Sequence, residues 1–205
     1  EMAVLLSAFG TRAAMQTMQA SLNPEIVYIA SETNLDIDMP QVASWRTYDS
    51  GLATPDTVEA EVFETGSTIF PHEKYDQSTW NAASPRTRVT SMTPMRAAIN
   101  HANRGDASHA DATLLASQMQ QRSRLYGAAL VRCFRNRPDL NQPSIIAVVP
   151  RSVRYSVHEA GRLDGNVRRV GRVEFDFELH MRETAIGETL PSQGLLPSVT
   201  YMELP

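Results

Sequence analysis

The sequence predicts an α+β domain in which a mostly antiparallel sheet packs against one long helix and a shorter helix, with extended loops or arms. Three observations predict this class. Residues 108–134 repeat apolar side chains at the spacing of an amphipathic helix. Residues 151–158 and 167–182 alternate apolar and polar side chains, as half-buried strands do. Stretches rich in proline, glycine and acidic residues separate and flank these elements.

Length and composition exclude several classes of protein. The chain has 205 residues, of which 42% are hydrophobic and 20% charged, so it fits one globular domain spanning 1–205 and not a disordered chain. Its single cysteine, Cys133, excludes an internal disulfide and a cysteine-based zinc site. No apolar run approaches the roughly 20 residues that a membrane span needs, so we expect no membrane partner.

The first third of the chain predicts little regular structure. Residues 2–22, rich in alanine and methionine, predict a weak helix; a signal peptide is the alternative, but the segment lacks a basic start. Pro24 opens a short predicted strand at 25–30. Residues 31–90 are predicted as an acidic region of loops or arms. One strand interrupts that region at 57–64, where valine and alanine alternate with glutamate.

The middle of the chain predicts a long loop followed by a short helix. Residues 65–90 show little period, and a loop of that length is usually functional or becomes ordered on a partner. Thr93 and Pro94 then resemble an N-cap and a first helical position, which predicts a helix to about Asn103.

The long helix is predicted over 108–134, capped by Ser108 or Asp111 and ended by the prolines that follow. Gly127 inside it predicts the close approach of another element. The predicted apolar stripe consists of Leu115, Met119, Tyr126, Leu130 and Cys133, widened by Leu114 and Leu125.

Three strands and an arm are predicted after the helix. Residues 144–149 form a continuous apolar run, which predicts a strand buried on both faces. The alternating strands 151–158 and 167–182 complete a helix-plus-hairpin core over 108–183. Residues 184–205 predict a C-terminal arm with a last strand at Ser198–Glu203.

The register of the predicted hairpin follows from its apolar rows. A two-residue Asp-Gly loop within 163–166 would place Tyr155 opposite Glu174 and put the two apolar rows on opposite faces. We therefore predict matched faces, through a three-residue turn or a bulge at Gly161 or Gly171. The three-residue turn gives the pairs Val157 with Val173, Tyr155 with Phe175, Val153 with Phe177, and Arg154 with Asp176.

Few residues form a constellation that points to catalysis or metal binding. Four side chains within eleven residues offer metal ligands, but their spacing matches no common motif and favours capping and solvated roles: His101, Asp106, His109 and Asp111. Four others share one face of the last strand, where cross-strand ion pairing is a simpler interpretation than an acid/base pair: Glu174, Asp176, Glu178 and His180. Cys133 is interpreted as a small buried hydrophobic residue. We predict no metal, no cofactor and no enzyme.

Charge is distributed unevenly along the chain, although the formal net charge is only −4. Residues 1–80 hold three basic and twelve acidic residues, a net charge of −9, whereas residues 81–205 hold sixteen basic and eleven acidic residues, a net charge of +5. Within 119–172, eleven arginines face three acids, a net charge of +8. The two halves either neutralise each other within one subunit or form the basic and acidic sides of a head-to-tail contact between subunits.

Arginines of the long helix and the hairpin are therefore the predicted interface. They are Arg122, Arg124, Arg132, Arg135, Arg151, Arg154, Arg162, Arg168, Arg169 and Arg172. The alternative reading is a nucleic-acid-binding module, against which stand a pI near 5.7 and the scarcity of lysine. An enzyme with a site on the acidic strand face is the least favoured reading.

The arrangement resembles a known class of viral proteins. Residues 108–183 combine a long helix, an arginine-rich hairpin and the alternating strand VGRVEFDFELHMRE at 170–183. This architecture resembles small neck and tail proteins of tailed bacteriophages, of the tail-terminator or head–tail connector type. The resemblance implies a homo-oligomeric ring or tube within a virion, contacts with other virion proteins, and DNA contact only as a secondary role. The acidic segment 31–90 departs from the compact members of that class.

Overall fold

The fold of the chain is that of a computed structural model. The structure describes residues 2–33, 37–46, 57–65, 74–76, 80–81, 84–103, 112–163 and 166–186. Within these ranges, side chains are described for residues 9–33, 37–46, 57–65, 92–103, 113–159 and 169–181.

Two helices and a set of strands make up the described fold, in an α+β arrangement. The helices are α1 (Met2–Glu32) and α2 (Ala112–Arg135). The short strands are β1 (Ser44–Arg46), β2 (Glu59–Glu64), β3 (Lys74–Asp76) and β4 (Trp80–Asn81). The long strands are β5 (Ser84–Ala102), β6 (Ile145–Leu163) and β7 (Asn166–Ile186).

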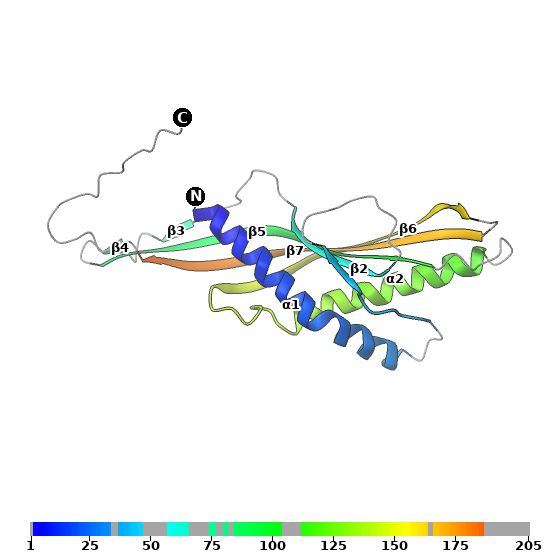
Figure 1. Ribbon diagram of the computed structural model, residues 1–205. Helices are drawn as coiled ribbons and strands as arrows, with labels where there is room; N and C mark the ends of the chain where they lie inside the picture. The colour runs from blue at the N-terminus through cyan, green and yellow to red at the C-terminus, as the bar shows by residue number, and fades with distance from the viewer. Residues whose placement is uncertain are drawn as a thin grey trace, which may run out of the picture.

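The sheet is elongated and mostly antiparallel, and both helices lie against it (Figure 1). Its strand order is β1-β2-β5-β7-β6, with β3 and β4 paired to β5. The pairing of β1 with β2 is parallel, and the others are antiparallel. The predicted fold class is confirmed, although the second helix is α1 and not the segment after Thr93.

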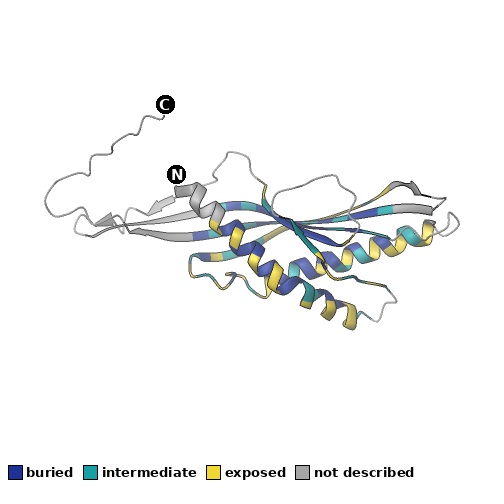
Figure 2. Cartoon of the chain, viewed as in Figure 1, coloured by how far each residue is buried: buried dark blue, intermediate teal, exposed yellow. Residues whose placement is uncertain are grey.

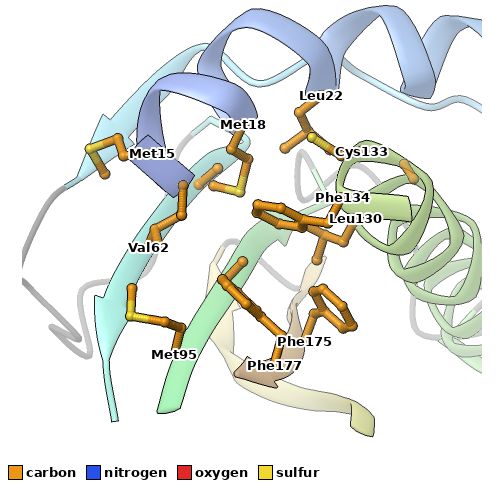
Figure 3. Close-up of a cluster of buried hydrophobic side chains, with 14 of the residues drawn as sticks. Met15, Met18, Leu22, Val62, Met95, Leu130, Cys133, Phe134, Phe175 and Phe177 are labelled. Carbon is orange, nitrogen blue, oxygen red and sulfur yellow. The ribbon is translucent and has the colours of Figure 1, made fainter. Parts of the chain in front are cut away.

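The core lies between the helices and one face of the sheet (Figure 3). Alternating side chains of β7 supply its floor, because Phe175, Phe177 and their same-face neighbours are at most 1% exposed. Phe134 of α2 packs on both rings, with ring centroids 5.7 Å from Phe175 and 4.7 Å from Phe177. Met18 of α1 covers the same cluster. The predicted alternation of this strand is confirmed.

Helix α1 corrects the predicted strand at 25–30. The helix continues through Pro24 to Glu32, although an interior proline costs a helix about 3 kcal/mol. Ile26 and Ile29 continue the buried stripe of Met15, Met18 and Leu22, and they are 0% and 7% exposed. Burial of those side chains offsets the hydrogen bond that Pro24 cannot make. The sequence pattern around the proline does not indicate this burial.

Strand β5 corrects the helix predicted from Thr93 to Asn103. Met95 and Ile99 are fully buried between β2 and β7, with a period of two. Pro94 fits because it stands where the pairing with β2 ends, and only its carbonyl is used there, accepting from Thr65 N at 3.0 Å. Strand β5 begins at Ser84, so part of the predicted loop 65–90 is sheet, as are β3 and β4.

Strand β6 joins the two strands predicted at 144–149 and 151–158. Register shifts leave one extra residue on β6 at Ile146, Arg151 and Ala160, whereas β7 pairs without a shift along β5. The run at 144–149 is not buried on both faces, since Ile146 is 45% exposed. The three register shifts are β-bulges, which are common in edge strands and rare in central strands.

The hairpin register confirms matched apolar faces but not the three-residue turn. Leu163 pairs with Asn166, which leaves a two-residue connection. The bulge between Glu159 and Gly161 then restores the match, as in the predicted alternative at Gly161. Tyr155 therefore lies opposite Val173. The four pairs predicted from a three-residue turn are wrong by two residues, because Val153 faces Phe175, Arg154 faces Glu174, Val157 faces Gly171, and Ser152 faces Asp176.

Helix α2 confirms most of the predicted apolar stripe. Met119, Tyr126, Leu130 and Cys133 are buried, whereas Leu114 is 60% exposed and lies outside the stripe. Both predicted caps of this helix, and nearly all of the predicted arm 184–205, lie outside the described residues.

Candidate interface on the outer edge of strand β6

The ten arginines of the predicted interface fall into three groups. Carboxylates of the same chain pair with Arg122, Arg132, Arg151, Arg154 and Arg172. Arg124 and Arg135 are exposed on α2 without an ion pair to any described residue, and Arg169 is half-buried at the start of the β7 ladder. The side chains of Arg162 and Arg168 lie outside the described residues.

A network of ion pairs covers the face of the sheet that points away from the helices. Its centre is Arg172, which binds Glu61 of β2 at 2.5 Å, Glu174 at 2.9 Å and the Asn100 side-chain oxygen at 2.9 Å. Burial raises the pKa of the Glu61 carboxyl, against the opposing effect of Arg172. Asp176 extends the network, as the partner of Arg96 at 2.7 Å and of Arg154 at 2.9 Å. Ion pairing, the favoured interpretation of the acidic strand face, is confirmed.

The arginines of α2 bind acids from the first part of the chain. Arg132 pairs with Glu25 of α1 at 2.8 Å, and its guanidinium lies 4.3 Å from the centre of the Tyr28 ring. Arg122 approaches Asp38 at 3.9 Å. Together with the Glu61 pair, these contacts use acids of the negative first part of the chain to neutralise part of the arginine-rich segment within one subunit.

His101 occupies a buried polar site beside Ser123. Its Nε2 lies 2.9 Å from Ser123 Oγ, and that hydroxyl donates to the Met119 carbonyl at 2.9 Å. Because the hydroxyl proton is used, His101 Nε2 is the donor to Ser123. The other suggested ligands lie outside the described residues, and within those residues no three His, Cys, Asp or Glu side chains gather into a group that could hold a metal.

Cys133 is expected to resist thiol reagents in the native protein. Its side chain is fully buried, and burial raises the pKa of the thiol to about 12, which removes the reactive thiolate at neutral pH. We expect no labelling by iodoacetamide at pH 8 until the chain is unfolded in guanidinium. A Ser117→Cys variant supplies an exposed thiol on the same helix and should label at once. Rapid labelling of native Cys133 would contradict the buried position.

The main chain of β6 can be oriented from two hydrogen bonds on β7. Asn103 N donates to Arg169 O at 3.2 Å, and Arg169 N donates to Asn103 Oδ1 at 2.6 Å, so Arg169 faces β5. Successive residues of an antiparallel strand direct their N–H and C=O groups to opposite sides. Residues 172, 174 and 176 therefore face β6, where Ser156, Arg154 and Ser152 are their partners. By the same alternation, residues 153, 155 and 157 direct their N–H and C=O groups away from the sheet.

An independent hydrogen bond supports this orientation. Val148 pairs with Leu179, which by the same alternation faces β5, so Val148 should point outward. Its N–H donates to the Pro138 carbonyl at 2.6 Å, on the side away from β7. Pro150 occupies the next outward position, where a missing N–H costs the ladder nothing. At the start of β6, the outward N–H of Val148 is therefore already bonded and Pro150 has no N–H to offer to another strand.

The outer edge of Ser152–His158, which we call the open edge, has neither a proline nor a backbone hydrogen bond to another described segment. It lies between the bulges at Arg151 and Ala160, so its pairing with β7 is regular. Within the described residues, no backbone hydrogen bond reaches the outward groups of Val153, Tyr155 and Val157. Figure 2 shows β6 at the border of the sheet with several exposed residues, and Tyr155 is 47% exposed.

A hollow of about 230 Å³ lies beside the open edge, between α2 and β6. Gln120 and Arg124 line it from the helix, and Tyr155 and Val157 line it from the strand. The Tyr155 ring lies against Gly127, where a Cβ would come within 2.7 Å of the tyrosine hydroxyl. The close approach predicted at Gly127 is confirmed. Main-chain groups, an apolar wall and one exposed guanidinium therefore meet at one place.

Sequence reasoning identified the arginines but not the open edge. The alternating pattern at 151–158 predicts a strand but not which strands lie beside it. Whether a strand is at the edge depends on the strand order of the sheet, which a local pattern does not determine. One indication was present, because Pro150 within a strand pattern is typical of an edge strand.

Comparison with known proteins does not assign the chain to a family. No protein-family model matches the chain, and no curated protein matches its sequence. Among the described residues, neither helix combines the length and the apolar character needed to cross a bilayer.

Proposed function

We propose that the chain is an assembly subunit that forms a homo-oligomeric ring or tube through head-to-tail contacts. The open edge of β6 is the observation that carries this proposal. The resemblance of the chain to phage neck and tail proteins gives the proposed setting. That setting is a bacteriophage virion in which other structural proteins are further partners.

An unprotected edge is the reason for preferring assembly. Strand edges that remain exposed in soluble proteins are usually blunted by bulges, prolines or charges, because they otherwise pair with other chains. Strand β6 has Pro150 and bulges on either side of the open edge, and Arg154 within that edge is held by Glu174 and Asp176, so a regular ladder remains between these devices. Half-buried Val153 and Val157 leave apolar surface for a partner to cover.

The charge pattern supports a contact between unlike surfaces. Arg124 remains exposed and unpaired to any described residue, beside the open edge, while many basic residues elsewhere are neutralised. Joining a basic patch of one copy to an acidic segment of the next produces a head-to-tail contact, which closes into a ring or extends into a tube. Nucleic-acid binding has less support, since five of its candidate arginines already bind carboxylates of the same chain.

The assembly is tested by measuring mass in solution over a range of protein concentrations. We expect oligomers that grow with concentration and that weaken but persist in high salt, because salt screens the Arg124 contact but has little effect on main-chain hydrogen bonds and apolar contacts. Tyr155→Pro removes one outward N–H and should weaken association at least about tenfold, a change of about 1.4 kcal/mol.

Tyr155→Ala is the matched control, because it removes the same side chain and keeps the N–H. It should associate more strongly than Tyr155→Pro. A wild-type chain that stays monomeric at every concentration and salt would overturn the proposed function.

A further inference from the structure

We propose that the open edge of β6 accepts residues 198–203 from a second copy of the chain as an added strand. This inference rests on the proposed function and names the segment that makes the head-to-tail contact. Each subunit would then supply one edge and one inserted segment, and the contact would repeat from copy to copy.

The acceptor side offers both affinity and selectivity. Outward N–H and C=O groups recur at Val153, Tyr155 and Val157, about 6.6 Å apart at a strand rise of about 3.3 Å per residue. A strand of about six residues can use all of them, in the manner of peptides that add to an exposed sheet edge. The hollow beside Tyr155 and Val157 can take one side chain of that strand, and Arg124 at its rim favours an acidic neighbour.

The donor is identified from the sequence outside the described residues. A donor strand should contain β-branched and aromatic side chains and no glycine or proline over at least six residues. Residues 198–204, which lie outside the described residues, meet these conditions. In a strand, Val199, Tyr201 and Glu203 share one face. That face offers an aromatic side chain for the hollow and a carboxylate for Arg124. Residues 187–205 contain two acids and no base, which suits the basic edge.

Chain length favours a second copy over the subunit's own segment. Ser152 at the start of the open edge is level with Asp176, ten residues before Ile186 at the end of β7. That separation is about 33 Å at about 3.3 Å per residue. The intervening residues 187–197 span at most about 36–40 Å when fully extended. They would also have to cross β7 and β6 laterally, so insertion into the same subunit requires an almost straight path.

Charge disfavours the direct pairing of two open edges. Such a twofold contact would bring the Arg124 side chains of both copies, neither of which has an ion pair to a described residue, to one junction. Like charges close together are unfavourable, whereas an acidic segment neutralises them. The added strand from residues 198–203 avoids this repulsion.

A complementation experiment with full-length variants tests the inference. Tyr155→Pro blocks the edge and keeps the inserted segment, while Thr200→Pro blocks the segment and keeps the edge. We expect each variant alone to lose at least about tenfold in self-association. We expect an equimolar mixture to form a heterodimer and nothing larger, as measured by sedimentation velocity and mass photometry. Thr200→Ala is the control for the side chain of the segment.

A second acceptor variant guards against misfolding of the proline variant. Arg124→Glu leaves the β6 backbone unchanged and should also weaken self-association at least about tenfold. Mixed with Thr200→Pro, it should form the same heterodimer as Tyr155→Pro does, because its own segment is intact and Thr200→Pro still carries an intact acceptor edge.

The outcomes separate the two proposals. If the wild-type chain assembles and Thr200→Pro assembles equally well, the added strand is wrong while the assembly function stands; direct pairing of two β6 edges gives this result. If the two proline variants are monomeric and their mixture stays monomeric, insertion between copies is overturned. If the wild-type chain is always a monomer, the proposed function fails as well.

Discussion

Replacing Arg172 with alanine is expected to lower the free energy of unfolding by about 3–5 kcal/mol at neutral pH, since removal of one partner leaves a buried charge uncompensated. The Glu61 side chain is 1% exposed, and Arg172 is its ion-pair partner in the described network at 2.5 Å. The second carboxylate that Arg172 binds, Glu174, retains Arg96 and Arg154 in the variant. The loss therefore falls mainly on Glu61.

The pH dependence of the Arg172→Ala variant identifies the cause. Burial raises the pKa of Glu61, and without Arg172 nothing equally close favours its charged form. The folded variant then binds a proton that the unfolded chain releases above the usual glutamate pKa, so its deficit should shrink as the pH falls from 8 to 5. Guanidinium unfolding at both pH values measures this change.

Two controls accompany this measurement. Arg151→Ala breaks an exposed pair with Glu178 and should leave stability nearly unchanged. A Glu61→Leu, Arg172→Met double variant removes both charges and should recover most of the loss. An Arg172→Ala variant as stable as the wild type would show that the Glu61 pair contributes little.

Acidification is expected to destabilise the protein through His101, by up to about 5 kcal/mol between pH 6.5 and pH 3, at about 1.4 kcal/mol per pH unit. Burial, together with the nearby positive charge of Arg122, lowers the pKa of His101 to about 3. The unfolded chain binds the proton below its ordinary pKa of 6.5, while the folded chain does not. Stability from this residue is therefore complete above pH 6.5 and declines below it.

The packing around His101 keeps the ring from escaping to water. Gly171 of β7 lies so close that a Cβ there would overlap the imidazole, and the Tyr126 ring centre is 5.1 Å away. His101→Gln keeps a donor for Ser123 and does not titrate. The wild-type chain should lose stability faster than this variant between pH 6.5 and pH 3, in urea unfolding followed by circular dichroism. Equal slopes would show that His101 is already protonated in the fold.

Elements with a strong period were predictable from the sequence. The alternation of Phe175 and Phe177 with acidic residues and the stripe of Met119, Tyr126 and Leu130 match the buried faces of β7 and α2. In these segments local pattern and tertiary burial agree, so the pattern is sufficient.

The errors occurred at prolines, where local chemistry and tertiary packing disagree. Pro24 predicts the start of a strand and Pro94 the start of a helix, yet the first lies inside α1 and the second inside β5. Packing of Ile26 on the core decides the first case, and the end of the β2 ladder decides the second. In both cases the deciding partner is distant in the sequence, because Ile26 packs on core residues of other elements and β2 lies about 30 residues before Pro94.

The candidate site was predictable only in part. Arg124 and Arg154 were named from charge density, and both lie beside the open edge. That Arg132 and Arg172 would instead bind Glu25 and Glu61 depends on contacts between residues more than 100 positions apart. Sequence spacing contains no measure of such pairing, so the two interpretations of the charge separation could be weighed only in three dimensions.

The long ladder of β7, which is unshifted against β5, has a mechanical consequence. This strand is held by β5 over residues 170–186 and by β6 along most of its length. Hydrogen bonds between antiparallel strands lie perpendicular to the strand axis. A pull along that axis must shear many of them at once, whereas a pull on the hairpin end would peel them in turn. If subunits are joined through β6, tension directed along the strands is distributed over the whole ladder, and the subunit is stiffest in that direction.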